Sequence, residues 1–183
     1  RLAGVAPAPE REAAARRAVQ GAFDAVVARM STYDPASELS RFNRHASTAP
    51  FALSADLLQV FAVAQRVSLE SAGAFDISVA PLVDAWGFGP AKHRDIPAAA
   101  TLARLGAGVG YRKVEVDRDA GVARKAHSLF AADLSGIAKG YGVDRAALAL
   151  EALGYADYMV EAGGEIRTRG RNASNLPWQI AIE

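Results

Sequence analysis

The sequence has no cysteine, and this absence excludes several kinds of site at once. Disulfides, thiolate metal sites and thiol nucleophiles are all ruled out, whereas an oxidising and a reducing compartment both remain open. Histidine is scarce as well: His45, His93 and His127 lack the short spacing of a zinc site, so we interpret them as surface residues. The sequence also offers no nucleophile elbow for Ser-His-Asp chemistry.

The sequence has neither an excess of one charge nor a long apolar run. Lys and Arg number 21 against 20 Asp and Glu, so we expect no polybasic surface and no nucleic-acid partner. No apolar run approaches the length of a bilayer span. The chain opens at Arg1 without a Met or a charged-then-apolar leader, and we expect that a leader has been removed.

Apolar residues make up 51% of the 183 positions, enough for a substantial core. We predict one domain over residues 1–183, mainly helical over 1–110 and mainly sheet with one helix over 111–183. Early helices followed by late strands indicate an α+β fold with an antiparallel or mixed sheet and flanking helices. Apolar periodicity and turn residues predict an ordered loop with a short helical turn at 31–43, helices at 10–30, 54–72, 97–106 and 146–153, a hairpin across 117–121, and strands at 129–134, 158–161, 165–169 and 178–182. We expect Ser54 to cap the helix at 54–72.

The stretch DLSGIAKGYGVDRAA, residues 133–147, places glycines and a lysine between a predicted strand and a predicted helix. Unsatisfied N–H groups and the positive end of a helix dipole favour an anion there. Lys139 adds a positive charge, and Gly136 and Gly140 permit close approach of a ligand. Neither a Walker motif nor a dinucleotide fingerprint is present. A nucleotide-binding strand-loop-helix unit and a plain turn with a solvated lysine both remain open.

Two further segments combine turn residues with polar groups. Glu161-Ala-Gly-Gly-Glu165 reads as a hairpin turn with exposed acids, whose glycines could also let a nucleotide lie against the backbone. In residues 31–43, Tyr33 can stack on a planar ring, whereas Ser37 and Glu38 are interpreted as capping groups. Further along, Phe75, Asp76 and Ser78 are candidates for a pocket wall, although Phe75 and Trp86 are also expected in the core.

Four segments occur together and in order: MSTYDPASELSRFN, AFDISVAPLVDAWGFGP, DLSGIAKGYGVD and YMVEAGGEIRTRG. This set closely resembles the FAD:protein FMN transferase family, the ApbE family of bacterial flavin transferases, from about residue 30 to residue 183. The resemblance implies an enzyme that binds FAD and Mg²⁺, cleaves the pyrophosphate, attaches FMN through a phosphoester to a Thr or Ser of a flavoprotein, and releases AMP.

The resemblance also implies roles for particular residues. Tyr33 would face the flavin ring, residues 136–140 would lie at the FAD diphosphate, and the backbone carbonyl of Ala138 would be a ligand of the metal. The residues implied in binding FAD are Tyr33, Ser37, Glu38, Asp76, Ser78, Ser135, Gly136, Ile137, Lys139, Gly140, Glu161, Gly163, Gly164 and Glu165. No residue is assigned a catalytic role.

Members of this family are commonly exported, often as periplasmic lipoproteins, and act on a subunit of a respiratory or redox complex. The early Met-Gly-Thr strand and the later His-Asp-Pro-type motif, with its Asp and Thr or Ser metal ligands, do not occur in this sequence. We therefore expect the C-terminal part of the family fold to be missing, and this chain alone to bind flavin poorly and to transfer nothing. Two alternatives are a non-catalytic FAD-binding protein and a structural or interaction domain.

Overall fold

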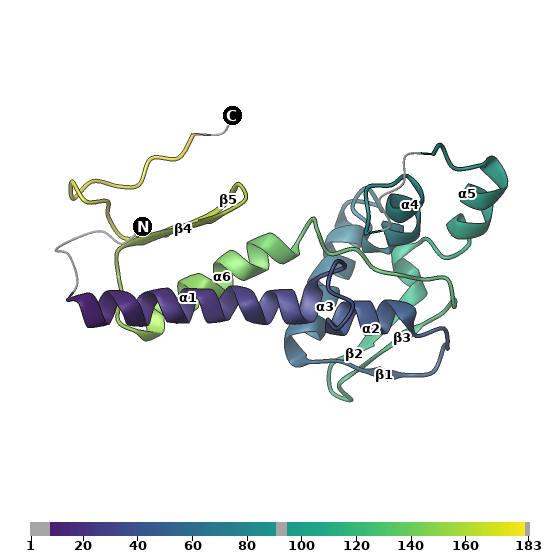
Figure 1. Cartoon of the computed structure of the whole chain (residues 1–183), viewed down its shortest axis with the longest axis horizontal. Coiled ribbons are helices and arrows are strands. Elements are labelled where there is room, and N and C mark those ends of the chain that lie inside the picture. The colour runs from purple at the N-terminus through teal and green to yellow at the C-terminus, as the bar shows by residue number, and fades with distance from the viewer. Residues whose placement is uncertain (1–7, 91–94, 182–183) are drawn as a thin grey trace. The chain divides into compact units, whose positions relative to one another are not determined.

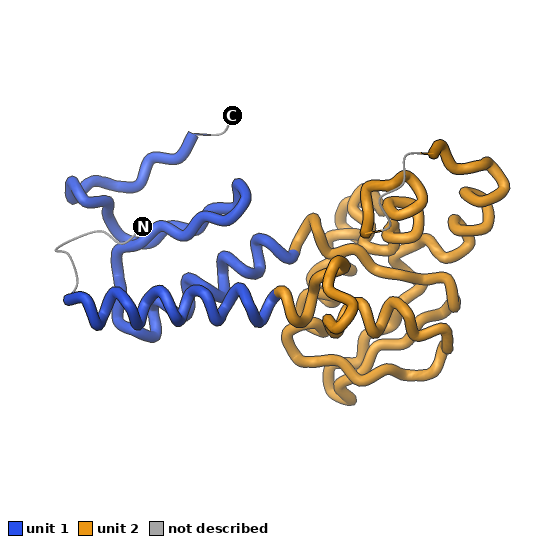
Figure 2. The backbone as a smooth tube through the Cα atoms, in the orientation of Figure 1, with its two compact units in different colours: residues 1–26, 138–183 blue, residues 27–137 orange. Residues whose placement is uncertain are grey.

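The computed structural model describes residues 8–90 and 95–181. Backbone contacts group the chain into two compact units (Figure 2). One unit takes its described residues from 1–26 and 138–183, and the other consists of residues 27–137. We call them the terminal unit and the central unit. The predicted single domain over residues 1–183 stays a prediction.

The described chain is α+β, with small antiparallel sheets and helices, which confirms the predicted fold class (Figure 1). Among the described residues, every helix except α6 ends before residue 114, and every strand except β1 begins at residue 114 or later. The elements are α1 (Pro9–Met30), α2 (Glu38–Arg44), β1 (Phe51–Ala52), α3 (Ala55–Glu70), the 3₁₀ helix η1 (Ile77–Val79), α4 (Ala80–Ala85), α5 (Ala99–Gly106), the 3₁₀ helix η2 (Tyr111–Lys113), β2 (Val114–Asp117), β3 (Val122–Lys125), α6 (Ala138–Ala152), β4 (Tyr158–Ala162) and β5 (Glu165–Arg169).

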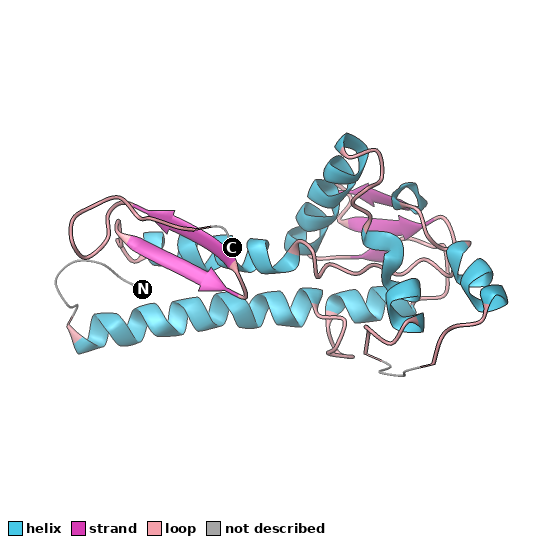
Figure 3. Ribbon diagram, turned by 90° about the horizontal axis from the view of Figure 1, so that it is seen from above, coloured by secondary structure: helices cyan, strands magenta, loops and turns pink. Residues whose placement is uncertain are grey.

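In the terminal unit, the β4–β5 hairpin packs on α6, and α6 packs on the part of α1 that ends at Val26. Figure 3 shows the two antiparallel strands side by side. Apolar side chains from α1, α6 and β4 form one core that includes Ala15, Val143 and Tyr158. A Cβ atom at Gly142 would lie 3.2 Å from the Phe23 ring, so the absence of a side chain lets α6 approach α1 closely.

The central unit is built on a sheet with the strand order β1-β3-β2, in which both pairs are antiparallel. The Phe42 side chain is fully buried, and its ring meets those of Phe51, Phe61 and Phe130 edge-on, with centroids 5.6–6.3 Å apart. Ser54 caps α3 as predicted, because its Oγ accepts a hydrogen bond from the Leu57 N–H group.

The strand predicted at residues 129–134 is wrong, because this segment has no regular secondary structure and pairs with no strand of the described chain. Other hydrogen bonds replace those that a neighbouring strand would make. The Asn43 side chain binds both backbone groups of Ala132, and the Asp133 N–H group donates to Ile77 O at 2.7 Å. The segment predicted as a nucleotide-binding strand-loop-helix unit is therefore an irregular segment, a turn and a helix.

Three other predictions need correction. Helix α6 begins at Ala138, eight residues before the predicted start, so Lys139 and Gly140 belong to its first turn. Residues 178–181 form no strand; only one bridge, Arg171 with Pro177, precedes them, and residue 182 lies outside the described chain. Trp86 is 47% exposed and does not belong to the core.

The histidine prediction is wrong at two of the three positions. His45 and His127 are half-buried: the His45 ring packs 5.1 Å from that of Phe51, and His127 Nδ1 accepts a hydrogen bond from the Leu129 N–H group at 3.0 Å. His93 lies outside the described residues. Within residues 8–90 and 95–181, none of the helices has the length and apolar character that crossing a bilayer requires.

Candidate flavin site

A cavity of about 970 Å³ lies within the central unit. Its walls come from α2, α4, α5, the loop before α2 and the segment 131–135. Tyr33 lines it with 61% of its surface exposed, and its hydroxyl donates a hydrogen bond to Phe88 O at 3.3 Å. The ring is thus tethered and still open to a planar ligand. Of the predicted site residues, Tyr33 and Ser135 share this cavity.

Ser37 and Glu38 are buried and bind other protein groups. Ser37 caps α2: its Oγ accepts from the Ser40 N–H group at 3.0 Å and donates to Ser31 O at 2.5 Å. The Glu38 carboxylate accepts from the Ser54 Oγ–H group at 2.6 Å and from the Ser54 N–H group. Glu38 therefore joins the start of α2 to the start of α3.

Asp76 and Ser78 join η1 to the loop before η2. Asp76 accepts from the N–H groups of Ser78, at 2.8 Å, and Tyr111, at 2.9 Å, through different carboxylate oxygens. Ser78 is fully buried, and its Oγ accepts from the Gly110 N–H group at 2.6 Å. These contacts fix the chain that enters α4, so both residues shape a cavity wall that they do not themselves line.

The turn before α6 is partly closed by its own hydrogen bonds. The Ser135 N–H group donates to Asp133 Oδ1 at 2.7 Å, and the Ile137 N–H group donates to Leu134 O at 2.9 Å. Gly136 is exposed, and a Cβ atom there would lie 3.2 Å from the Phe75 ring. The first turn of α6 itself presents N–H groups that have no i−4 carbonyl within the helix, the usual arrangement at an anion site.

In the terminal unit, Lys139 meets the β4–β5 turn. Gly163 and Gly164 have φ values of 58° and 90°, as a two-residue hairpin turn of the primed type requires. Lys139 Nζ donates to Gly163 O at 3.0 Å and lies 3.6 Å from Glu165 Oε1. Glu161 Oε1 accepts from the Gly164 N–H group at 3.1 Å. The structure thus brings together five residues predicted from two separate motifs, Lys139 and four residues of the Glu161–Glu165 turn.

The described residues do not form a magnesium site by themselves. Mg²⁺ requires near-octahedral coordination by oxygen atoms. Residues 8–90 and 95–181 contain no group of three or more His, Asp or Glu side chains placed to hold a metal. The predicted ligand, the backbone carbonyl of Ala138, is at the start of α6 and would supply one oxygen.

Sequence reasoning missed Asn43 and Lys125. The Asn43 side chain lines the cavity and binds the backbone of Ala132. Lys125 is 1% exposed, and its Nζ donates to Asn43 O and His45 O, both at 2.9 Å. Burial lowers the pKa of Lys125 from 10.5 to about 8. The strand pattern carried a signal for Lys125, because residues i and i+2 share a face and Ala123 is in the core.

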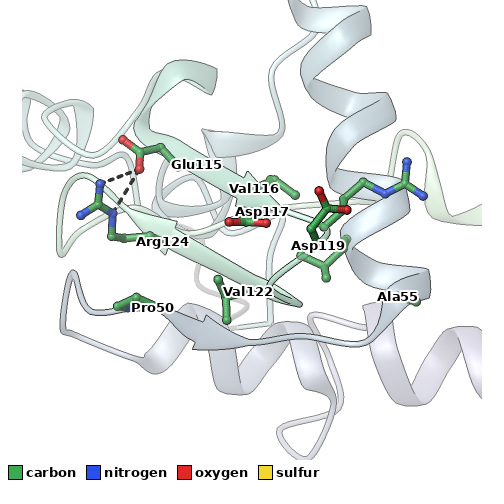
Figure 4. A pocket seen from close by; sticks show the side chains of 10 residues that line it. Pro50, Ala55, Glu115, Val116, Asp117, Asp119, Val122 and Arg124 are labelled. Atoms are coloured by element: carbon green, nitrogen blue, oxygen red, sulfur yellow. Dashed lines mark hydrogen bonds and ion pairs between the residues drawn. The ribbon is translucent and has the colours of Figure 1, made fainter.

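A second cavity of the central unit, of about 980 Å³, lies over β2, β3 and the start of α3. Glu115 and Arg124 point toward each other there, with 2.6 Å between Oε2 and Nη2 (Figure 4). The charged side chains that line it are exposed, and none belongs to the predicted site.

Comparison with known proteins gives concordant matches. The model of the ApbE family matches residues 3–183. Two curated proteins named FAD:protein FMN transferase are similar to this chain. The protein of Haemophilus influenzae is 46% identical over 162 residues, which cover 86% of this chain and 47% of the relative. The protein of Vibrio cholerae is 44% identical over 155 residues, which cover 84% of this chain and 46% of the relative. The chain spans about half the length of the curated relatives it matches.

Two solved structures resemble the whole chain. The flavin transferase ApbE of Vibrio cholerae superposes with a TM-score of 0.88 at 40% identity, over 100% of this chain and 58% of that one. The apo form of the Pseudomonas stutzeri flavinyl transferase ApbE also gives a TM-score of 0.88, at 31% identity, over 99% of this chain and 59% of that one. The chain belongs to the ApbE family.

Proposed function

We propose that the protein carrying this chain is an FAD:protein FMN transferase, which moves FMN from FAD to a Thr or Ser hydroxyl of a flavoprotein in a Mg²⁺-dependent reaction. The observation that carries the proposal is the identity of up to 46% with relatives named for this activity, over most of the chain. The cavity containing Tyr33 supports it, because a tethered and exposed aromatic ring at a cavity of this size suits a planar ring system.

The proposed reaction is a phosphoryl substitution. The acceptor hydroxyl oxygen attacks the phosphorus on the FMN side of the diphosphate, and the bond from that phosphorus to the bridging oxygen breaks. AMP leaves with the bridging oxygen, the hydroxyl proton is released, and FMN remains joined through a phosphoester. Such a reaction depends on positioning and on stabilising the charge of the phosphate oxygens.

The residues of this chain are proposed to bind and orient FAD. In the central unit, Tyr33 would face the flavin ring. In the terminal unit, Lys139 and the N–H groups of the first turn of α6 would bind phosphate oxygens, for which Lys139 would exchange its contacts with Gly163 O and Glu165. Bound Mg²⁺ would neutralise charge on the diphosphate. The described residues hold no metal on their own, so their contribution is to binding and positioning.

We propose a flavoprotein subunit of a respiratory or redox complex as the acceptor, and the periplasm as the location, with a lipid anchor on the exported form. The support for both is the family resemblance of the four sequence segments. Fractionation of cells that produce the protein would place flavin transfer in the periplasmic and membrane fractions, and recovery of the protein in the cytoplasmic fraction would contradict the location.

The test of function combines the protein with FAD, Mg²⁺ and an acceptor flavoprotein, then measures AMP by chromatography and protein-bound flavin by mass spectrometry. Transfer releases AMP and flavin-labelled acceptor in equal amounts, and an acceptor with its Thr or Ser replaced by Ala serves as control. Retention of intact FAD without AMP would favour a flavin-binding protein. Failure to retain FAD after dialysis, with no rise in melting temperature, would favour a structural domain.

A further inference from the structure

We propose that Asn43 is a positioning residue that fixes residues 131–135 as a wall of the cavity in the central unit, and thereby sets the affinity for FAD. The effect on FAD affinity rests on the proposed function, whereas the positioning of residues 131–135 concerns the protein without ligand. Asn43 lies in the last turn of α2 and itself lines the cavity.

The contact between Asn43 and Ala132 is bidentate. Asn43 Nδ2 donates to Ala132 O at 2.8 Å, and Asn43 Oδ1 accepts from the Ala132 N–H group at 2.8 Å. The orientation of the carboxamide is fixed, because a backbone N–H group can only donate and a carbonyl can only accept. One side chain therefore satisfies both backbone groups of a fully buried residue 89 positions away.

The two hydrogen bonds from Asn43 replace those that a neighbouring strand would otherwise make with Ala132. Residues 129–134 are mostly apolar but have no regular secondary structure and pair with no strand of the described chain. On either side of the buried Ala132, the neighbours Ala131 and Asp133 line the cavity, as does Ser135. Without Asn43, two buried backbone groups of Ala132 would lose their partners, so the wall would have to shift or admit water.

The backbone of Asn43 is in turn bound by the Lys125 side chain. Lys125 Nζ donates to Asn43 O and to His45 O, which are carbonyls at the C-terminal end of α2, where a cation is favourable. The ammonium also lies 4.9 Å from the centroid of the Phe42 ring. The backbone of Asn43 is therefore anchored by Lys125, while its side chain anchors the wall.

Gln65 provides a matched control. It is a half-buried carboxamide of the same unit, and its Nε2 donates to Val114 O at 2.5 Å, joining α3 to β2. It does not line the cavity. Asn43→Ala and Gln65→Ala each remove a carboxamide bound to the backbone, but only the first removes a contact with the wall. Asn43→Asp keeps the side-chain size and the acceptor for the Ala132 N–H group but lacks the donor to Ala132 O. This variant replaces Asn43→Ala in the experiment if Asn43→Ala does not fold.

The experiment measures hydrogen exchange by mass spectrometry and FAD affinity by fluorescence titration, well below the melting temperature of each variant. In Asn43→Ala, exchange of residues 131–135 should accelerate by about tenfold or more, and the Kd for FAD should rise by a similar factor, since a displaced wall misplaces the ligand. In Gln65→Ala, both quantities should stay within about twofold of the unsubstituted protein, because its lost contact lies elsewhere.

Two results overturn the proposal: unchanged exchange at 131–135 in both Asn43 variants, or equal losses of FAD affinity in the Asn43 and Gln65 variants. If the unsubstituted protein binds no FAD, the proposed function fails. Hydrogen exchange of residues 131–135 in the protein without ligand then decides by itself whether Asn43 fixes this wall. Failure of the proposed function and failure of the role of Asn43 are therefore distinguishable.

Discussion

The charge of the buried Lys125 should make the stability of the protein depend on pH in the alkaline range. Its ammonium donates to two backbone carbonyls while only 1% of the residue is exposed. Burial lowers the pKa of Lys125 from 10.5 to about 8, because a low-dielectric surrounding disfavours the charged form. The folded protein therefore loses this proton at a lower pH than the unfolded chain does.

The direction of the effect follows from this order of the two pKa values. Between about pH 8 and pH 10.5, the unfolded chain keeps a proton that the folded protein has lost, so the free energy of unfolding rises with pH. The full difference corresponds to about 3 kcal/mol at roughly 1.4 kcal/mol per pKa unit. Between about pH 7 and about pH 9.5, the expected increase is about 2 kcal/mol.

Urea unfolding of the unsubstituted protein and of Lys125→Met over this pH range measures the effect. Methionine has a similar length and no charge, so the variant lacks the linkage but shares every other titrating group. The loss of two hydrogen bonds in the variant adds an offset that is the same at each pH. The unsubstituted protein should gain about 2 kcal/mol relative to the variant. Parallel curves, or a gain in the opposite direction, would refute the reasoning.

Four other substitutions have expected outcomes. Ser54→Ala removes the cap of α3 and the hydroxyl donor to Glu38, and should lower the free energy of unfolding by about 1–2 kcal/mol in urea titrations. An unchanged midpoint would contradict the capping role. Gly164→Ala, at φ 90°, should cost about 1–2 kcal/mol in thermal unfolding, whereas Gly140→Ala, in α6 with open space at the Cβ position, should stabilise by up to about 1 kcal/mol; equal shifts would count against the turn geometry. Lys139→Met should weaken FAD binding about tenfold in fluorescence titrations and barely change stability, because its ion pair with Glu165 is half exposed; unaltered affinity would exclude Lys139 from the site.

Elements with strong local signals could be predicted from the sequence. The apolar periodicity of α1, the Ser54 cap of α3 and the glycine pair between β4 and β5 each determine local structure within a few residues, and all three were predicted correctly. These signals act over one turn of helix or one hairpin, where the chain's own propensities dominate.

The errors fall where distant contacts decide the structure. Asn43 satisfies the backbone of Ala132 from 89 residues away, so the segment around Ala132 needs no strand partner, and no local pattern reveals this. The early start of α6 has a similar cause. Gly142 weakens a helix by propensity, but it lets α6 pack closely on Phe23, and that packing outweighs the propensity.

The candidate site was predicted only in part for the same reason. Residue types identified Tyr33 and Lys139, whose aromatic and cationic groups suit a flavin and a diphosphate. They could not reveal that Glu38 and Asp76 bind backbone N–H groups of the protein, because those partners lie 16 and up to 35 residues away in the sequence. Polar groups that build the walls of a site and polar groups that bind its ligand look alike in a sequence.

The most direct test is a crystal structure of the protein with FAD and Mg²⁺. Phosphate oxygens of FAD should lie within hydrogen-bonding distance of the N–H groups in the first turn of α6 and of Lys139 Nζ. A bound FAD whose phosphates lie elsewhere, with Lys139 still on Gly163 O, would contradict the proposed site.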